Sequence, residues 1–119
     1  MIFNALQDAA GRGELILVDG GMCHYHLRLD GVLTIREIIV LPERQRQGIG
    51  QAILDRLQAV PGTRAIRAKC PEELPANGWY RACGFKFAYI DQTRRGGRLF
   101  VWELAVNGTA DERPTTRTT

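Results

Sequence analysis

The chain has 119 residues, of which 45% are hydrophobic and 24% are charged. That length suits one globular domain, because two domains would each be too small for a good core. The composition excludes a collagen-like, coiled-coil or mainly disordered chain. No apolar run approaches the ~20 residues that span a bilayer, and the first residues lack the basic and apolar segments of a signal peptide. We therefore expect a cytoplasmic protein with no membrane partner.

The charged residues and the cysteines further limit the classes of function that the chain can have. The net charge is +3, and arginine carries almost all of the positive charge. Arginine suits phosphate and carboxylate groups, so this mild excess fits an anionic cofactor and does not by itself imply nucleic-acid binding. Cys23, Cys70 and Cys83 are odd in number and widely spaced. This pattern favours reduced, mostly buried thiols over a disulfide framework or a metal site.

The first half of the chain predicts a short helix at residues 4–10 and strands at residues 14–18, 22–29 and 32–41. Asp30 and Gly31 form a hairpin signal, so the second and third strands should be antiparallel. Pro42 follows the third strand and ends it.

The second half begins with apolar residues at helical spacing over residues 48–60, which predict an amphipathic helix. A strand at residues 64–70 follows, and then a short helix at residues 77–83 with Asn77 as its N-cap. Strands at residues 85–90 and 99–106 are joined by a polar loop, and residues 107–119 predict a disordered tail. This order of elements indicates a mixed sheet in an α/β (α+β) domain.

The junction between the third strand and the main helix is the most informative segment. Residues 45–51 read Gln-Arg-Gln-Gly-Ile-Gly-Gln. The unpaired N–H groups at a helix start attract anions, and Gly48 and Gly50 would let a phosphate approach the backbone. Arg44 and Arg46 add positive charge. The segment matches neither a P-loop nor a dinucleotide fingerprint. It predicts a diphosphate-binding turn, and a solvated glycine-rich loop is the alternative.

Residues 45–50 resemble the acyl-CoA motif of the GNAT acetyltransferase superfamily, Gln/Arg-x-x-Gly-x-Gly/Ala. Downstream, residues 79–85 resemble the family's Tyr-x-x-x-Gly-Phe helix. The resemblance extends over residues 14–106 and implies one domain at residues 1–106. It implies a mixed, mostly antiparallel sheet with flanking helices, in which the parallel strands 32–41 and 64–70 form a central, splayed pair.

The resemblance also implies that acetyl-CoA binds where those two strands separate. The backbone of residues 38–40 would pair with the pantetheine arm, and the amides of residues 46–51 would hold the diphosphate. The implied cofactor-binding residues are Ile38, Ile39, Val40, Gln45, Arg46, Gln47, Gly48, Ile49, Gly50, Gln51 and Asn77.

Acetyl transfer to an amine requires a neutral amine, a donor to the oxyanion and a proton for the leaving thiolate. The resemblance implies that Tyr80 supplies that proton and that the N–H of Val40 faces the oxyanion. A tyrosine in a helix also often serves only for packing. Trp79 and Phe85 are interpreted as core residues.

Glu37 is the best candidate for the catalytic base, because it is a carboxylate in an otherwise apolar strand. The alternative is an ion pair with Arg36 or Arg67. His24 and His26 share one face of the neighbouring strand and are candidate substrate-binding residues, although strand-surface histidines without a special role fit as well. Glu72 and Glu73 lie in a later loop and are further candidates to reach the substrate.

The predicted function is N-acetyl transfer from acetyl-CoA to a primary amine of a small molecule, a protein or a modified base. Many family members have a longer N-terminal segment that builds the acceptor site, so we expect an open acceptor side or one completed by a second subunit in a homodimer. The compact layout also resembles phage-encoded acetyltransferases. The alternatives are a non-catalytic acyl-CoA-binding protein, a phage-type nucleic-acid-modifying or anti-defence protein, and a basic nucleic-acid-binding module.

Overall fold

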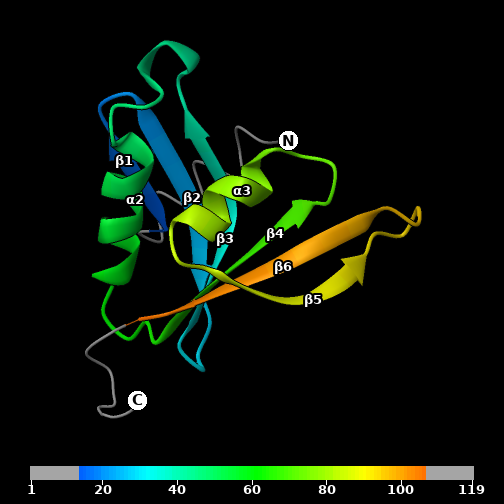
Figure 1. Cartoon of the computed structure of the whole chain (residues 1–119). Coiled ribbons are helices and arrows are strands. Elements are labelled where there is room, and N and C mark those ends of the chain that lie inside the picture. The colour runs from blue at the N-terminus through cyan, green and yellow to red at the C-terminus, as the bar shows by residue number, and fades with distance from the viewer. Residues whose placement is uncertain (1–13, 107–119) are drawn as a thin grey trace.

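Six strands form one sheet with the order β1-β2-β3-β4-β6-β5 in the computed structural model, which describes residues 14–106 (Figure 1). The predicted helix at residues 4–10 and the predicted tail at residues 107–119 lie outside the described residues. The elements are β1 (Leu15–Val18), β2 (Gly21–Leu27), β3 (Val32–Val40), the 3-10 helix η1 (Pro42–Arg44), α2 (Ile49–Gln58), β4 (Ala65–Pro71), α3 (Ala76–Ala82), β5 (Lys86–Gln92) and β6 (Arg98–Ala105). The predicted mixed sheet is confirmed.

Strands β3 and β4 are the parallel pair, and the other neighbouring strands are antiparallel. The parallel pairing covers only three residue pairs, from Val32 with Ala65 to Thr34 with Arg67. Beyond Thr34 the two strands have no shared hydrogen-bonding register, so β3 and β4 separate toward their C-terminal ends. The predicted splay is therefore present, and it leaves backbone groups of both strands free at the centre of the sheet.

Both helices pack on the same face of the sheet, where they bury one continuous core (Figure 1). Helix α2 contacts β1, β2 and β3, and α3 contacts β4 and β5. The amphipathic pattern of α2 places Ile53, Leu54 and Leu57 at 1% exposure or less, and each such side chain contributes roughly 1.5–3 kcal/mol by burial. None of the helices within residues 14–106 is both long and apolar enough to cross a membrane.

A β-bulge in β3 changes which side chains face the helices. His24 of β2 lies opposite Glu37, whereas Tyr25 lies opposite Ile35, so Arg36 has no partner in the register. The extra residue reverses the alternation of side chains. Ile38, two residues past the bulge, packs against the core beneath the helices, and Glu37 faces the opposite side of the sheet.

The predicted N-cap of the second helix is wrong. Helix α3 begins at Ala76 and its N-cap is Pro75, so Asn77 lies inside the first turn. The amide of Asn77 donates hydrogen bonds to the carbonyl oxygens of Pro71 and Leu74, both at 2.9 Å, and its Oδ1 accepts the indole N–H of Trp102 at 2.8 Å. Asn77 therefore ties the β4–α3 loop to β6.

Candidate functional site

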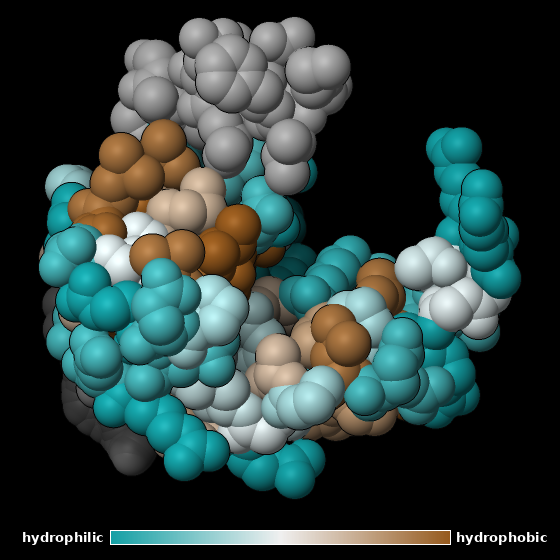
Figure 2. All heavy atoms as spheres, turned by 90° about the horizontal axis from the view of Figure 1, so that it is seen from above, coloured by the Kyte–Doolittle hydropathy of each residue, from teal (hydrophilic) through white to brown (hydrophobic). Residues whose placement is uncertain are grey.

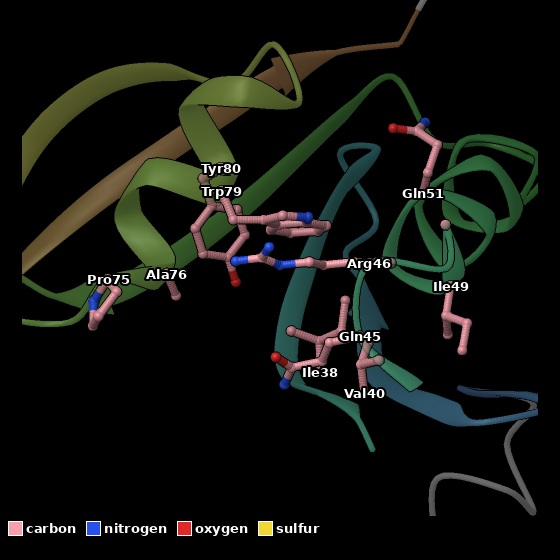
Figure 3. A pocket seen from close by; sticks show the side chains of 12 residues that line it. Ile38, Val40, Gln45, Arg46, Ile49, Gln51, Pro75, Ala76, Trp79 and Tyr80 are labelled. Atoms are coloured by element: carbon pink, nitrogen blue, oxygen red, sulfur yellow. The ribbon is translucent and has the colours of Figure 1, made fainter. Parts of the chain in front are cut away.

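A pocket of about 760 Å³ lies between the C-terminal half of β3, the start of α2 and one face of α3 (Figure 3). This is the region where β3 has separated from β4. The lining residues are Ile38, Val40, Gln45, Arg46, Gly48, Ile49, Gly50, Gln51, Pro75, Ala76, Trp79 and Tyr80. The two sequence motifs, almost thirty residues apart in the chain, thus line one pocket.

The end of the pocket whose geometry suits an anion is the N-terminus of α2. Gly48 is the N-cap, with φ of 79° and no side-chain capping bond, and the first turn holds no acidic residue. The first N–H groups of the helix therefore have no capping partner and carry the positive end of the helix dipole. A Cβ at Gly48 would meet no atom within 4 Å, so glycine is needed there for its backbone conformation. Arg46 also has a positive φ, of 67°.

Gly50 is needed for a different reason, because it lets α3 approach α2. A Cβ on Gly50 would lie 2.9 Å from Cζ2 of Trp79. The indole of Trp79 therefore packs directly on the backbone of the first turn of α2. Figure 3 shows Trp79 and Tyr80 reaching from α3 toward Arg46 and Ile38 on the other side of the pocket.

Tyr80 combines a buried ring with an unpaired hydroxyl group. The residue is 5% exposed, and its ring makes edge contacts with Trp79 and Phe85 at centroid distances of 5.1 and 5.2 Å. The only buried side-chain oxygen or nitrogen without a partner in residues 14–106 is Oγ1 of Thr63, so the Tyr80 hydroxyl remains open to the pocket that it lines. Burial raises the pKa of Tyr80 to about 12, so the phenol keeps its proton at neutral pH.

Three of the predicted cofactor-binding residues do not line the pocket with the others. Ile39 faces the opposite side of the sheet from Ile38. Gln47 accepts a hydrogen bond from Nε of Arg44 at 2.8 Å. Asn77 uses its amide and its carbonyl oxygen within the protein, so its geometry points to a role in holding α3. Arg44 itself pairs with Asp19 at 3.1 Å.

The predicted base and substrate-binding residues lie on the face of the sheet away from the helices. Glu37 and His24 are direct register neighbours, and both are partly buried. Arg67 pairs with Glu103 at 2.7 Å, and within residues 14–106 Glu37 forms the alternative ion pair with neither Arg36 nor Arg67. His26 is held by Glu14, with 2.7 Å between Nδ1 and Oε2, which gives this histidine a structural contact.

Three residues of α3 and its N-cap line the pocket without having been predicted there: Pro75, Ala76 and Trp79. Trp79, expected in the core, is only partly buried. A signal was available, because positions 75, 76, 79 and 80 repeat at the spacing of one helical face. A helix that presents Tyr80 to a pocket must present these positions as well.

The three cysteines form no disulfide bond. Cys23, Cys70 and Cys83 are free, and the first two are buried. Each of these thiols has a pKa above its ordinary value because burial disfavours the thiolate, so none is an activated nucleophile. Within residues 14–106 no group of three or more histidine, cysteine or acidic side chains is placed to hold a metal ion.

Comparison with known proteins places this arrangement in context. A family model described as an acetyltransferase (GNAT) domain matches residues 2–87. A GNAT-family acetyltransferase structure from Bacillus cereus has a TM-score of 0.73 at 18% identity and covers 86% of this chain and 77% of that chain. The ribosomal-protein-S18-alanine N-acetyltransferase from Escherichia coli has a TM-score of 0.62 at 23% identity, with coverages of 81% and 67%.

An aminoglycoside 6'-N-acetyltransferase solved with coenzyme A has a TM-score of 0.73 at 12% identity, with coverages of 89% of this chain and 80% of that chain. No curated protein sequence matches the chain. The structural likenesses establish the fold. The family model also identifies a family, because it matches well over half of the chain.

Proposed function

The chain belongs to the GNAT acetyltransferase family, and on this premise we propose that it transfers an acetyl group from acetyl-CoA to a primary amine by direct attack of the amine. The observation that carries the proposal is a pocket that unites the uncapped N-terminus of α2, the edge of β3 that no longer pairs with β4, and the hydroxyl of Tyr80. A neighbouring structure that was solved with coenzyme A supports the choice of cofactor.

The residues of the pocket suit two parts of acetyl-CoA, the diphosphate and the pantetheine arm. The uncapped N–H groups at the start of α2 suit a diphosphate, and the bare backbone at Gly48 leaves room for it. Residues 38–40 of β3 pair with β2 on one edge and have no β4 partner on the other. This free edge suits the amide groups of the pantetheine arm, which would pair with it like an added strand. When bound, acetyl-CoA supplies an acetyl group that is activated as a thioester.

Tyr80 and Glu37 take complementary proton roles in this proposal. The Tyr80 phenol, with a pKa of about 12, holds a proton at neutral pH and donates it to the leaving sulfur. Glu37 lies on the other face of the sheet, beside the gap between β3 and β4, and accepts the proton of the amine directly or through water. The N–H of Val40 is the candidate donor to the carbonyl oxygen of the acetyl group.

The test is to measure coenzyme A binding by calorimetry and thiol release from acetyl-CoA in the presence of amines. Gly48→Glu should abolish binding, because a carboxylate would meet the diphosphate. Gly96→Glu is the matched control, since Gly96 also has a left-handed φ, of 87°, and a Cβ there would likewise meet no atom within 4 Å, but it lies in the β5–β6 turn. Equal affinity in the two variants would contradict the diphosphate site.

The same measurements distinguish the proposed acetyl transfer from the alternative functions. A protein that binds coenzyme A without releasing thiol with any amine would be a non-catalytic acyl-CoA-binding protein. A protein that binds DNA with steep salt dependence, and does not bind coenzyme A, would be a basic nucleic-acid-binding module. A phage-type anti-defence role, a homodimer and a cytoplasmic location remain predictions from the sequence.

A further inference from the structure

A row of apolar side chains, exposed at its two ends and half-buried at its middle, crosses three strands on the face of the sheet away from the helices. Leu17 of β1 lies opposite Met22 of β2, and Met22 lies opposite Ile39 of β3. Leu17 is 65% exposed and Ile39 is 44% exposed. Figure 2 shows a hollow in the molecule with hydrophobic residues gathered to its left, the side on which Figure 1 has α2 and strands β1–β3. Contiguous apolar side chains on an exposed face mark a binding surface.

The next row of the same face carries an unpaired carboxylate. Leu15, His24 and Glu37 are register neighbours, one from each of the same three strands. Within residues 14–106 the side chain of Glu37 makes no ion pair or hydrogen bond. Other carboxylates on this face are neutralised, since Glu103 pairs with Arg67 at 2.7 Å and Asp91 with Lys69 at 2.8 Å. Among the described residues, this face therefore offers the free negative charge of Glu37 beside an apolar row.

These two rows lie where an amine would approach. Tyr80 approaches the reacting centre from the helix side of the sheet, and the gap beyond Thr34 joins that side to the face of Glu37. An amine that attacks a thioester carbonyl must come from a direction that leaves the departing sulfur free to meet its proton donor. The face that carries Glu37 and the apolar row satisfies this requirement.

We propose that Leu17, Met22 and Ile39 form, with Glu37, an acceptor subsite for a primary amine with one positive charge and an apolar body. The inference rests on the proposed acetyl transfer and names its substrate class. One ammonium group matches one free carboxylate, whereas a polyamine would bring further charges to a face whose other acids are already paired. In the reaction the ammonium gives one proton to Glu37, and the neutral amine forms the new N–C bond as the C–S bond breaks. The sulfur takes the proton of Tyr80, and the second proton of the acetylated nitrogen passes to the Tyr80 oxygen, directly or through water.

Two sources share this chemistry, a free alkyl or aryl amine and the α-amino group of a peptide that begins with an apolar residue. The experiment measures kcat/KM for phenethylamine, for spermidine and for tetrapeptides that begin with leucine or serine. We expect phenethylamine or the leucine peptide to exceed spermidine and the serine peptide, and the better of the two identifies the source. A preference for spermidine would overturn the proposal while leaving acetyl transfer intact.

The variant Leu17→Ser tests the apolar row directly. Leu17 lies on β1, outside the residues of the coenzyme pocket, and the loss of part of its contact area should lower kcat/KM for the apolar amine about fivefold, chiefly through KM. Leu29→Ser is the control, because Leu29 is a fully exposed leucine in the distant β2–β3 turn. Equal effects of the two variants would overturn the subsite.

A binding readout keeps the two proposals distinguishable. Saturation-transfer NMR of phenethylamine on coenzyme-A-loaded protein reports on the subsite without any turnover. Binding that Leu17→Ser weakens and Leu29→Ser does not would uphold the subsite even if no thiol were released, and in that case only the proposed catalysis would fail. Absence of both binding and turnover with phenethylamine and the leucine peptide would overturn the subsite.

Discussion

A methyl group is costly at both Gly48 and Gly50, but for different physical reasons that can be measured separately. At Gly50 the new Cβ would lie 2.9 Å from Cζ2 and 3.3 Å from Cε2 of Trp79, which is closer than carbon atoms normally approach. At Gly48 there is no atom within 4 Å, but φ is 79°. We therefore expect Gly50→Ala to act through Trp79 and Gly48→Ala to act through the backbone alone.

The expected magnitudes follow from these contacts. One additional methyl group in a packed contact costs roughly 1–3 kcal/mol, and alanine in place of glycine within a helix recovers about 1 kcal/mol. Gly50→Ala should thus lower the free energy of unfolding by about 1 kcal/mol. Gly48→Ala should lower it by roughly 1–2 kcal/mol, the cost of a left-handed conformation for an L-residue.

Replacement of the indole separates the two effects. Phenylalanine lacks the part of the Trp79 ring that would oppose the methyl group, so Trp79→Phe should relieve the cost of Gly50→Ala and leave that of Gly48→Ala unchanged. The assay is equilibrium unfolding in urea for both double-mutant cycles. The Gly50 cycle should show a coupling of roughly 1–3 kcal/mol, the full packing cost that Trp79→Phe relieves, and the Gly48 cycle should be additive within ~0.5 kcal/mol. Additivity in both cycles would refute the assigned contact.

Three further predictions concern proton transfer and stability. Tyr80→Phe should lower kcat ~100-fold with little change in coenzyme A affinity by calorimetry, and wild-type turnover would reduce Tyr80 to a packing residue. Glu37→Gln should remove the acidic limb of the pH–rate profile, whereas an unaltered profile would assign the base elsewhere. Burial raises the pKa of Cys23 from 9.0 to about 12, so the folded state keeps a proton that the unfolded state loses. That contribution to stability is complete below pH 9 and is lost as the pH rises toward 12. Cys23→Ala should flatten the fall in unfolding free energy above pH 9 by about 1.4 kcal/mol per pH unit, and equal slopes in urea titrations would contradict the burial argument.

The sequence alone predicted the types and order of the six strands and of helices α2 and α3 between residues 14 and 106, because these depend on local patterns. It did not predict the short 3-10 helix η1. The hairpin signal at Asp30 and Gly31, and the apolar spacing of α2, each act within a few residues. The same holds for the pocket motif, since a left-handed glycine and a helix N-terminus are local features. Most of the predicted cofactor residues therefore line one pocket.

The tertiary structure decided on which face of the sheet each side chain lies and which distant residues it contacts. Simple alternation would have placed Glu37 on the same side as Ile35, but the bulge at Arg36 turns Glu37 to the opposite face. The contacts of Asn77 with Trp102 and of Trp79 with Gly50 likewise join residues that are distant in the chain. Such choices depend on strand register and on the approach of one helix to another, which are set by long-range packing and leave no signal within a short stretch of sequence.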